Sequence, residues 1–246
     1  MKMKYIKVAT VAIVFVALLA ACGRGGIFGE RLRGEGPLVP HVLDLGVFST
    51  IDISGFFIID FTRSDDHAIT LYMQENLFYY HEVIVRNGNL TITDNIRGGV
   101  EFTYTPRLHI SAPYLTDITL SGNVIAPDWD EISTYGLTIT TSGFASVDIP
   151  LNVNRLTVNS TGSSILIFSG TASSVDAYIT GFADMRAANL LVSDASIDGS
   201  GSAQVEIYVT DSLDVNLSGF ANVRYGGNPS ITSRFSGSAR LERLDD

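Results

Sequence analysis

One six-residue pattern returns along the chain at almost constant intervals. It reads SGFASV at 142–147 and comes back as TGFADM, SGSAQV, SGFANV and SGSARL. A degenerate earlier copy, TLSGNVI, places Gly122 before the first clear repeat. A period of about twenty residues is typical of solenoids, in which each repeat forms one coil that contacts only its neighbours. The glycines of the clear repeats, separated by 19, 19, 20, 18 and 18 residues, are Gly143, Gly162, Gly181, Gly201, Gly219 and Gly237.

Apolar residues occupy fixed positions around these glycines. The position six residues earlier is filled by Leu137, Leu156, Val175, Ala195, Leu213 and Ile231. Every second residue is apolar on either side of the glycine, which indicates two short strands joined at a tight corner. A coil of 18–20 residues that turns back on itself has no room for a helix. The sequence therefore predicts an all-β fold, a right-handed parallel β-helix whose coils stack about 4.8 Å apart.

The residue after each glycine alternates between large and small. The column reads Phe144, Ser163, Phe182, Ser202, Phe220 and Ser238. Two interpretations remain open, and we favour the first. The rings interdigitate with the hydroxyls inside the stack, or they face solvent as an aromatic stripe that contacts a ligand.

Residues 41–112 precede the clear repeats. Runs such as STIDIS, AITLYM, EVIVR and NLTITD alternate in hydrophobicity and are separated by SDDH, RNGN and NIRGG. This pattern predicts a β-hairpin-rich opening part. Only YMQENLFYYH at 72–81 has a helical character.

The N-terminus has the features of an export signal. MKMKYIK carries three lysines, an uncharged run follows, and LAAC ends at Cys22, the only cysteine. We predict a signal peptide over 1–21 and lipidation of Cys22, because LAAC resembles the bacterial lipobox. Cleavage removes all the lysines of the chain and changes its formal charge from −10 to −13, so nucleic acid is not an expected partner.

Residues 22–40 are rich in glycine and carry mixed charge. They are expected to form a flexible tether between the lipid and the fold. The remaining chain, 41–246, is expected to form one β-solenoid domain, with the opening part at 41–112 and the repeat coils at 113–246. This organisation predicts a protein of the cell envelope that is anchored through Cys22 and lies outside the cytoplasm.

The lipobox, the FSTIDISGFFIIDF opening, the NGNLTIT strand and the serial SGSA and SGFA corners are together similar to one family. The chain resembles the putative auto-transporter adhesin, head GIN domain family over about residues 45–243. That resemblance implies a secreted bacterial protein with a parallel β-helical core. The GFA corners depart from the small GSG corners that the family favours.

Motifs for catalysis are weak. The four histidines precede the repeats without the spacing of metal ligands, HEVIV at 81–85 lacks a second histidine, and no nucleophile elbow or nucleotide-binding loop occurs. No cofactor and no metal site are expected. The PDWDEI segment places Asp128 and Asp130 beside Trp129, the only tryptophan. We interpret it as an acidic loop with a partly buried anchor, the alternative being a platform on which Trp129 stacks against a sugar.

These features favour a non-catalytic adhesion module that presents repeated side chains to an extracellular glycan or an envelope protein. The candidate contacts are Trp129, Asp128, Asp130, Phe144, Phe182 and Phe220. Two alternatives remain: a structural or assembly component of the cell envelope, and a polysaccharide-active β-helix enzyme.

Overall fold

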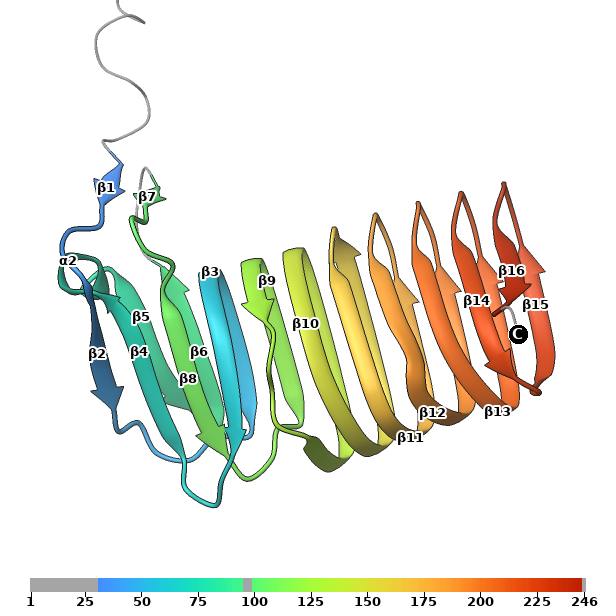
Figure 1. Cartoon of the computed structure of the whole chain (residues 1–246), viewed down its shortest axis with the longest axis horizontal. Helices are drawn as coiled ribbons and strands as arrows, with labels where there is room; N and C mark the ends of the chain where they lie inside the picture. The colour runs from blue at the N-terminus through green and yellow to red at the C-terminus, as the bar shows by residue number, and fades with distance from the viewer. Residues whose placement is uncertain (1–30, 95–98, 245–246) are drawn as a thin grey trace, which may run out of the picture.

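The computed structural model describes residues 31–94 and 99–244, and strands make up most of them. Figure 1 shows a row of stacked coils along the long axis of the molecule, with a group of shorter strands at the N-terminal end. The predicted β-solenoid is confirmed, with about six turns.

The coils consist of strands that pair in parallel with the coil before and the coil after. Several of these strands run through a corner without a break, so one strand contributes to two sides of the coil (Figure 1). In chain order they are β9 (Asp117–Ala126), β10 (Ile132–Gly162), β11 (Ile165–Ile179), β12 (Asp184–Gly199), β13 (Gln204–Leu217), β14 (Asn222–Gly227), β15 (Ser230–Phe235) and β16 (Arg240–Arg243).

The register follows the repeat. Gly143 pairs with Gly122 and Leu156 pairs with Val175, as the sequence columns predict. The inward columns form one continuous core, because side chains alternate between the interior and solvent along each strand. In the last coil this core is uncovered, and Ile231 and Phe235 are 40% and 49% exposed.

The opening part is β-rich, as predicted, and covers the first coil. Its strand β3 (Thr50–Arg63) pairs in parallel with β9, with β6 (Asn89–Asp94) and with β8 (Arg107–Ala112). The remaining strands are β1 (Leu32–Arg33), β2 (Leu38–Leu43), β4 (Ala68–Gln74), β5 (His81–Arg86) and β7 (Val100–Glu101). We call β2 and the elements from β4 to β8 the N-terminal cap. Antiparallel pairing of β2 with β4, β4 with β8, and β5 with β6 distinguishes the cap from the coils.

The corner column begins inside this part. Gly55 pairs with Gly122 at the same corner, although 67 residues separate them in sequence, because the strands of the cap are inserted between two adjacent coils. The helical character of 72–81 proves to be a single turn, α2 (Glu75–Phe78). Among the described residues, no helix is long and apolar enough to cross a membrane.

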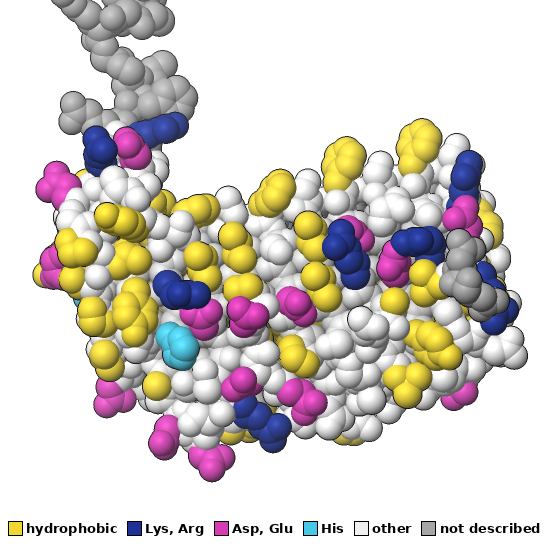
Figure 2. All heavy atoms as spheres, viewed as in Figure 1, with side chains coloured by type: hydrophobic (Ala, Val, Ile, Leu, Met, Phe, Trp, Pro, Cys, Tyr) yellow, Lys and Arg dark blue, Asp and Glu magenta, His cyan; other side chains and the backbone are white. Residues whose placement is uncertain are grey.

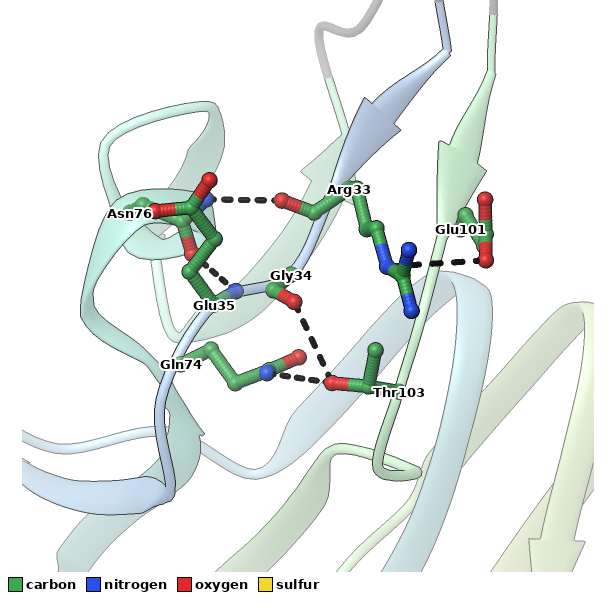
Figure 3. A network of polar contacts seen from close by, with 7 residues as sticks. All are labelled: Arg33, Gly34, Glu35, Gln74, Asn76, Glu101 and Thr103. Carbon is green, nitrogen blue, oxygen red and sulfur yellow. Dashed lines mark hydrogen bonds and ion pairs between the residues drawn. The ribbon is translucent and has the colours of Figure 1, made fainter.

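Part of the predicted tether is ordered on the cap. The side-chain amide of Asn76 donates to the Arg33 carbonyl at 2.8 Å and accepts from the Glu35 amide at 3.0 Å. The buried Gln74 donates to the Gly36 carbonyl. It also donates to Thr103 Oγ1, as Figure 3 shows. Residues 31–40 therefore differ from the expected flexible linker, because side chains of β4 and α2 bind their backbone.

Candidate functional site

The glycine corners fix the geometry of one long edge of the solenoid. Gly143, Gly181 and Gly219 have φ values of 84°, 85° and 72°, which residues with a Cβ rarely adopt. A Cβ on Gly143 would lie 2.7 Å from the carbonyl oxygen of Gly122 in the preceding coil. Glycine is thus required here both by the backbone conformation and by the close stacking of the coils.

The residue after each glycine is held by the same stacking. The backbone N–H of Phe182 donates to the Gly162 carbonyl at 2.8 Å, and that of Phe220 donates to the Gly201 carbonyl at 2.7 Å. Each phenylalanine thus stands at a fixed place relative to the coil before it.

These rings face solvent. Phe144, Phe182 and Phe220 are 63%, 74% and 71% exposed, so the favoured interpretation of interdigitated packing is wrong. Alternation explains the outcome: the next residue in each repeat, such as Ala145 or Ala183, is buried, so the residue before it must point outward. That small alanine column was the signal in the sequence that could have placed the rings outside.

The exposed rings recur at every second coil, which gives a separation of about 10 Å. Figure 2 shows hydrophobic side chains projecting from the edge at which the corners lie. We call Phe144, Phe182 and Phe220, with the serines between them, the phenylalanine row. At the earlier corners Phe56 stacks on Phe102 at a centroid distance of 5.6 Å, and Asn123 follows, so the row begins at Phe144.

Polar residues flank the phenylalanine row. Three residues before successive glycines stand outward-facing Thr140, Asn159, Tyr178, Asp198, Asn216 and Arg234. Asn216 donates to Asp198 at 2.7 Å across neighbouring coils. The row is therefore an apolar ridge with one hydrogen-bonding slope, which these six residues form.

A patch of charged side chains on β12, β13 and β14 forms its ion pairs within the chain. Arg186, Glu206 and Arg224 are paired in register on three successive coils. Arg186 forms an ion pair with Asp184 at 2.7 Å, and Arg224 forms one with Glu206. Opposite charges on adjacent strands stabilise the stack, so this patch has a structural explanation.

The PDWDEI segment does not form a sugar platform. Trp129 is only 5% exposed, its Nε1 donates to the Ile59 carbonyl at 2.8 Å, and its ring packs against Phe61. Asp130 accepts from the Arg63 amide at 2.8 Å. The alternative role for Trp129 as a ligand contact is therefore wrong, because the indole anchors its coil to β3, while Asp128 stays exposed. Thus, of the predicted contacts, the structure groups the three phenylalanines at one edge and leaves Asp128, Trp129 and Asp130 apart from them.

Comparison with known families settles the relationship suggested by the corners. The family model described as "Putative auto-transporter adhesin, head GIN domain" matches residues 47–229. The chain belongs to this family. No curated protein matches it.

Solved structures share the fold of this head GIN domain. A putative adhesin from Bacteroides fragilis has a TM-score of 0.78 at 22% identity, covering 87% of this chain and 100% of its own. A putative adhesin from Parabacteroides distasonis has a TM-score of 0.71 at 20% identity, with the same coverage. A protein from P. distasonis described as a putative lipid binding protein gives 0.71 at 17% identity, covering 88% of this chain and 100% of its own.

In the part of the chain that the structure describes, no three His, Cys, Asp or Glu side chains are placed to hold a metal ion. Burial lowers the pKa of His81 below 6.5, while its hydrogen bond to the Leu77 carbonyl and the charge of Asp94 act in the opposite direction. His81 lies in the cap, far along the chain from the phenylalanine row. Cys22, the predicted lipidation site, lies outside the described residues.

Proposed function

We propose that this protein is a lipid-anchored, non-catalytic adhesion module on the extracytoplasmic side of the cell envelope, and that it binds its ligand along the phenylalanine row. The observation that carries the proposal is the exposure of three rings at regular intervals on one edge. Membership in a family described as adhesins agrees with it.

A row of this kind suits binding better than catalysis. Covering an exposed phenylalanine releases its hydration water and is worth about 1.5–3 kcal/mol when the ring is fully buried. The backbone hydrogen bonds at the corners fix the Cα positions of these residues, so binding has to order only the side-chain rotamers of the rings. Several such contacts at fixed spacing add up to strong attachment between surfaces, even when each contact is weak.

The arrangement of the chain fits attachment at one end. Strand β1 lies at the cap end of the stack. The coils from β10 to β14, whose corners carry the phenylalanine row, extend from the middle of the stack toward the other end (Figure 1). A lipid on Cys22, before β1, would hold the cap end near the membrane and leave the row accessible. Cys22→Ser should then abolish labelling by a fatty-acid analogue, and equal labelling of the variant would remove the lipid anchor from the proposal.

Adhesion of cells that carry the full chain tests the proposal. Attachment to a defined surface under flow should fall at least tenfold for the variant Phe144→Ser/Phe182→Ser/Phe220→Ser. The matched control, Tyr79→Ser/Tyr104→Ser/Tyr135→Ser, removes three exposed aromatic rings elsewhere and should stay within about twofold of wild type. Equal attachment of the phenylalanine variant and wild type would contradict the proposal.

A glycan array separates the remaining ligands. Binding without product release supports an adhesion module that takes glycans, and release of shortened glycan would show an enzyme. Capture of one dominant envelope protein that depends on the row would instead favour an assembly role.

A further inference from the structure

The phenylalanine row is complementary to its own reverse. Over six successive corners it alternates large and small, starting with Phe144 and ending with Ser238. Read backwards, the same row starts small and ends large. We propose that the partner of the row is a second copy of this chain, docked antiparallel so that the rings of each copy enter the gaps of the other. This inference rests on the proposed adhesion function and names its partner.

One alignment satisfies all six corners at once. In it Phe144 faces Ser238, Phe182 faces Ser202, and Phe220 faces Ser163 of the second copy. A two-fold axis between the corners of Gly181 and Gly201 relates the copies, so the same surface serves both partners and the contact is closed. A parallel arrangement about a two-fold axis along the row would place each ring against the same ring.

The flanks agree with this alignment. The two-fold axis brings the same slope of both copies together in reverse order. Tyr178 then faces Asp198 of the second copy, and Asn159 faces Asn216. Both pairs can form hydrogen bonds, and Arg234 faces Thr140, so the slope brings no two like charges together in a chain of net charge −10.

The exposed area indicates a weak and reversible contact. Six rings that are about two-thirds exposed offer about 800 Å² of surface in total. Specific stable interfaces bury about 1,200–2,000 Å², and transient encounters lie below that range. The slopes add area, but the pair remains suited to many parallel contacts between two surfaces. Because the copies are antiparallel, their cap ends point in opposite directions, as a bridge between two facing membranes requires.

The mass of the full chain tests the inference, measured by sedimentation over a concentration series in a mild non-ionic detergent after production without lipidation. Wild type should dimerise reversibly. Phe182→Ser removes a ring and Ser202→Phe fills a gap, so each should raise the dissociation constant at least tenfold. The double variant Phe182→Ser/Ser202→Phe exchanges ring and gap between two corners that face each other across the axis. It should therefore return the constant to within about threefold of wild type.

Two controls locate the contact. Tyr135→Ser removes an exposed ring outside the row, and Phe235→Ser alters the uncovered last coil. Both should leave the dissociation constant unchanged. The inference would be overturned if Phe235→Ser lost the dimer and Phe182→Ser kept it. The copies would then associate through the ends of their stacks.

Other outcomes separate this inference from the adhesion function. A wild-type chain that stays monomeric to about 1 mM overturns the second copy as partner. If the wild-type chain is monomeric but replacing its three phenylalanines with serine still abolishes surface attachment, the adhesion function stands and the row binds another ligand. Ser202→Phe adds a ring to the row, which obstructs a second copy because a ring of that copy faces the same corner. If Ser202→Phe instead strengthens binding of a glycan or an apolar partner, self-docking is likewise overturned.

Discussion

A single residue type sets the shape of the edge that carries the phenylalanine row. The corner glycines combine positive φ with close contact between coils, and these two effects can be separated by substitution. Gly201 has a φ of 74°, and its Cβ would lie 2.9 Å from the Gly181 carbonyl oxygen. Gly46 has a φ of 86° with nothing within 4 Å, and Gly136 has neither constraint.

Valine substitutions at these three glycines should therefore differ in cost. Gly136→Val should change the free energy of unfolding by no more than about 0.5 kcal/mol. Gly46→Val should cost about 1–3 kcal/mol through backbone strain alone, and Gly201→Val should exceed it by about 1–3 kcal/mol through crowding. Urea denaturation measures all three. Equal losses at Gly46 and Gly201 would show that the coils do not stack as closely as described.

His81 gives the cap a pH dependence. Because burial lowers its pKa in the folded state below the 6.5 expected when unfolded, the unfolded chain takes up the proton first as the pH falls. The stability is therefore fully present above about pH 6.5 and decreases below it, toward the folded-state pKa. His81→Gln should reduce the slope of unfolding free energy against pH between 6.5 and 5. An unchanged slope in His81→Gln would contradict the prediction.

At the scale of elements, the strands and register of the periodic part can be predicted from the sequence, whereas the strand pairing of the cap cannot. The strands on both sides of Gly143 and Gly201 follow from columns that repeat every 18–20 residues. The place of Gly55 does not, because the inserted cap strands break the period before Gly122. Sequence indicates that Trp129 is a partly buried anchor but not what it is anchored to, since its hydrogen-bond partner Ile59 is 70 residues away.

The outward direction of the phenylalanine side chains could have been predicted from the sequence. Strict alternation with the buried alanines decides it, whereas the alternation of large and small residues from coil to coil suggested packing. The second pattern is real, but its counterpart under our proposal lies on another copy of the chain and not inside this one.

Residues 31–40, which lead into the N-terminal cap, depend for their local stability on a few side chains. Asn76 accounts for two of the hydrogen bonds that hold residues 33–35, so Asn76→Ala should loosen this segment alone. Amide hydrogen exchange at Gly34 and Glu35 should accelerate about tenfold, which corresponds to about 1.4 kcal/mol of local stability. Amides of β11 and β12 should not change, and neither should any in the control Asn154→Ala. Faster exchange throughout the coils would mean that the cap and the stack unfold as one unit.

The whole molecule is a rigid stack that carries an ordered row of rings along one edge. Each coil contacts only its neighbours, so the row can have any length that the number of coils allows, and its spacing is that of the sheet. On this account, the order of rings and gaps along the edge determines which partner is accepted. A chain with the order changed at two corners should accept itself and reject the original.

Sorting of coated beads tests this central claim most directly. Beads of one colour carry the full wild-type chain, and beads of a second colour carry Phe182→Ser/Ser202→Phe, both coupled through Cys22. Each chain matches its own reverse, but the mixed pair places ring against ring at one corner and gap against gap at the next. The account predicts separate aggregates of each colour. Mixed aggregates of both colours, or no aggregation of either, would contradict it.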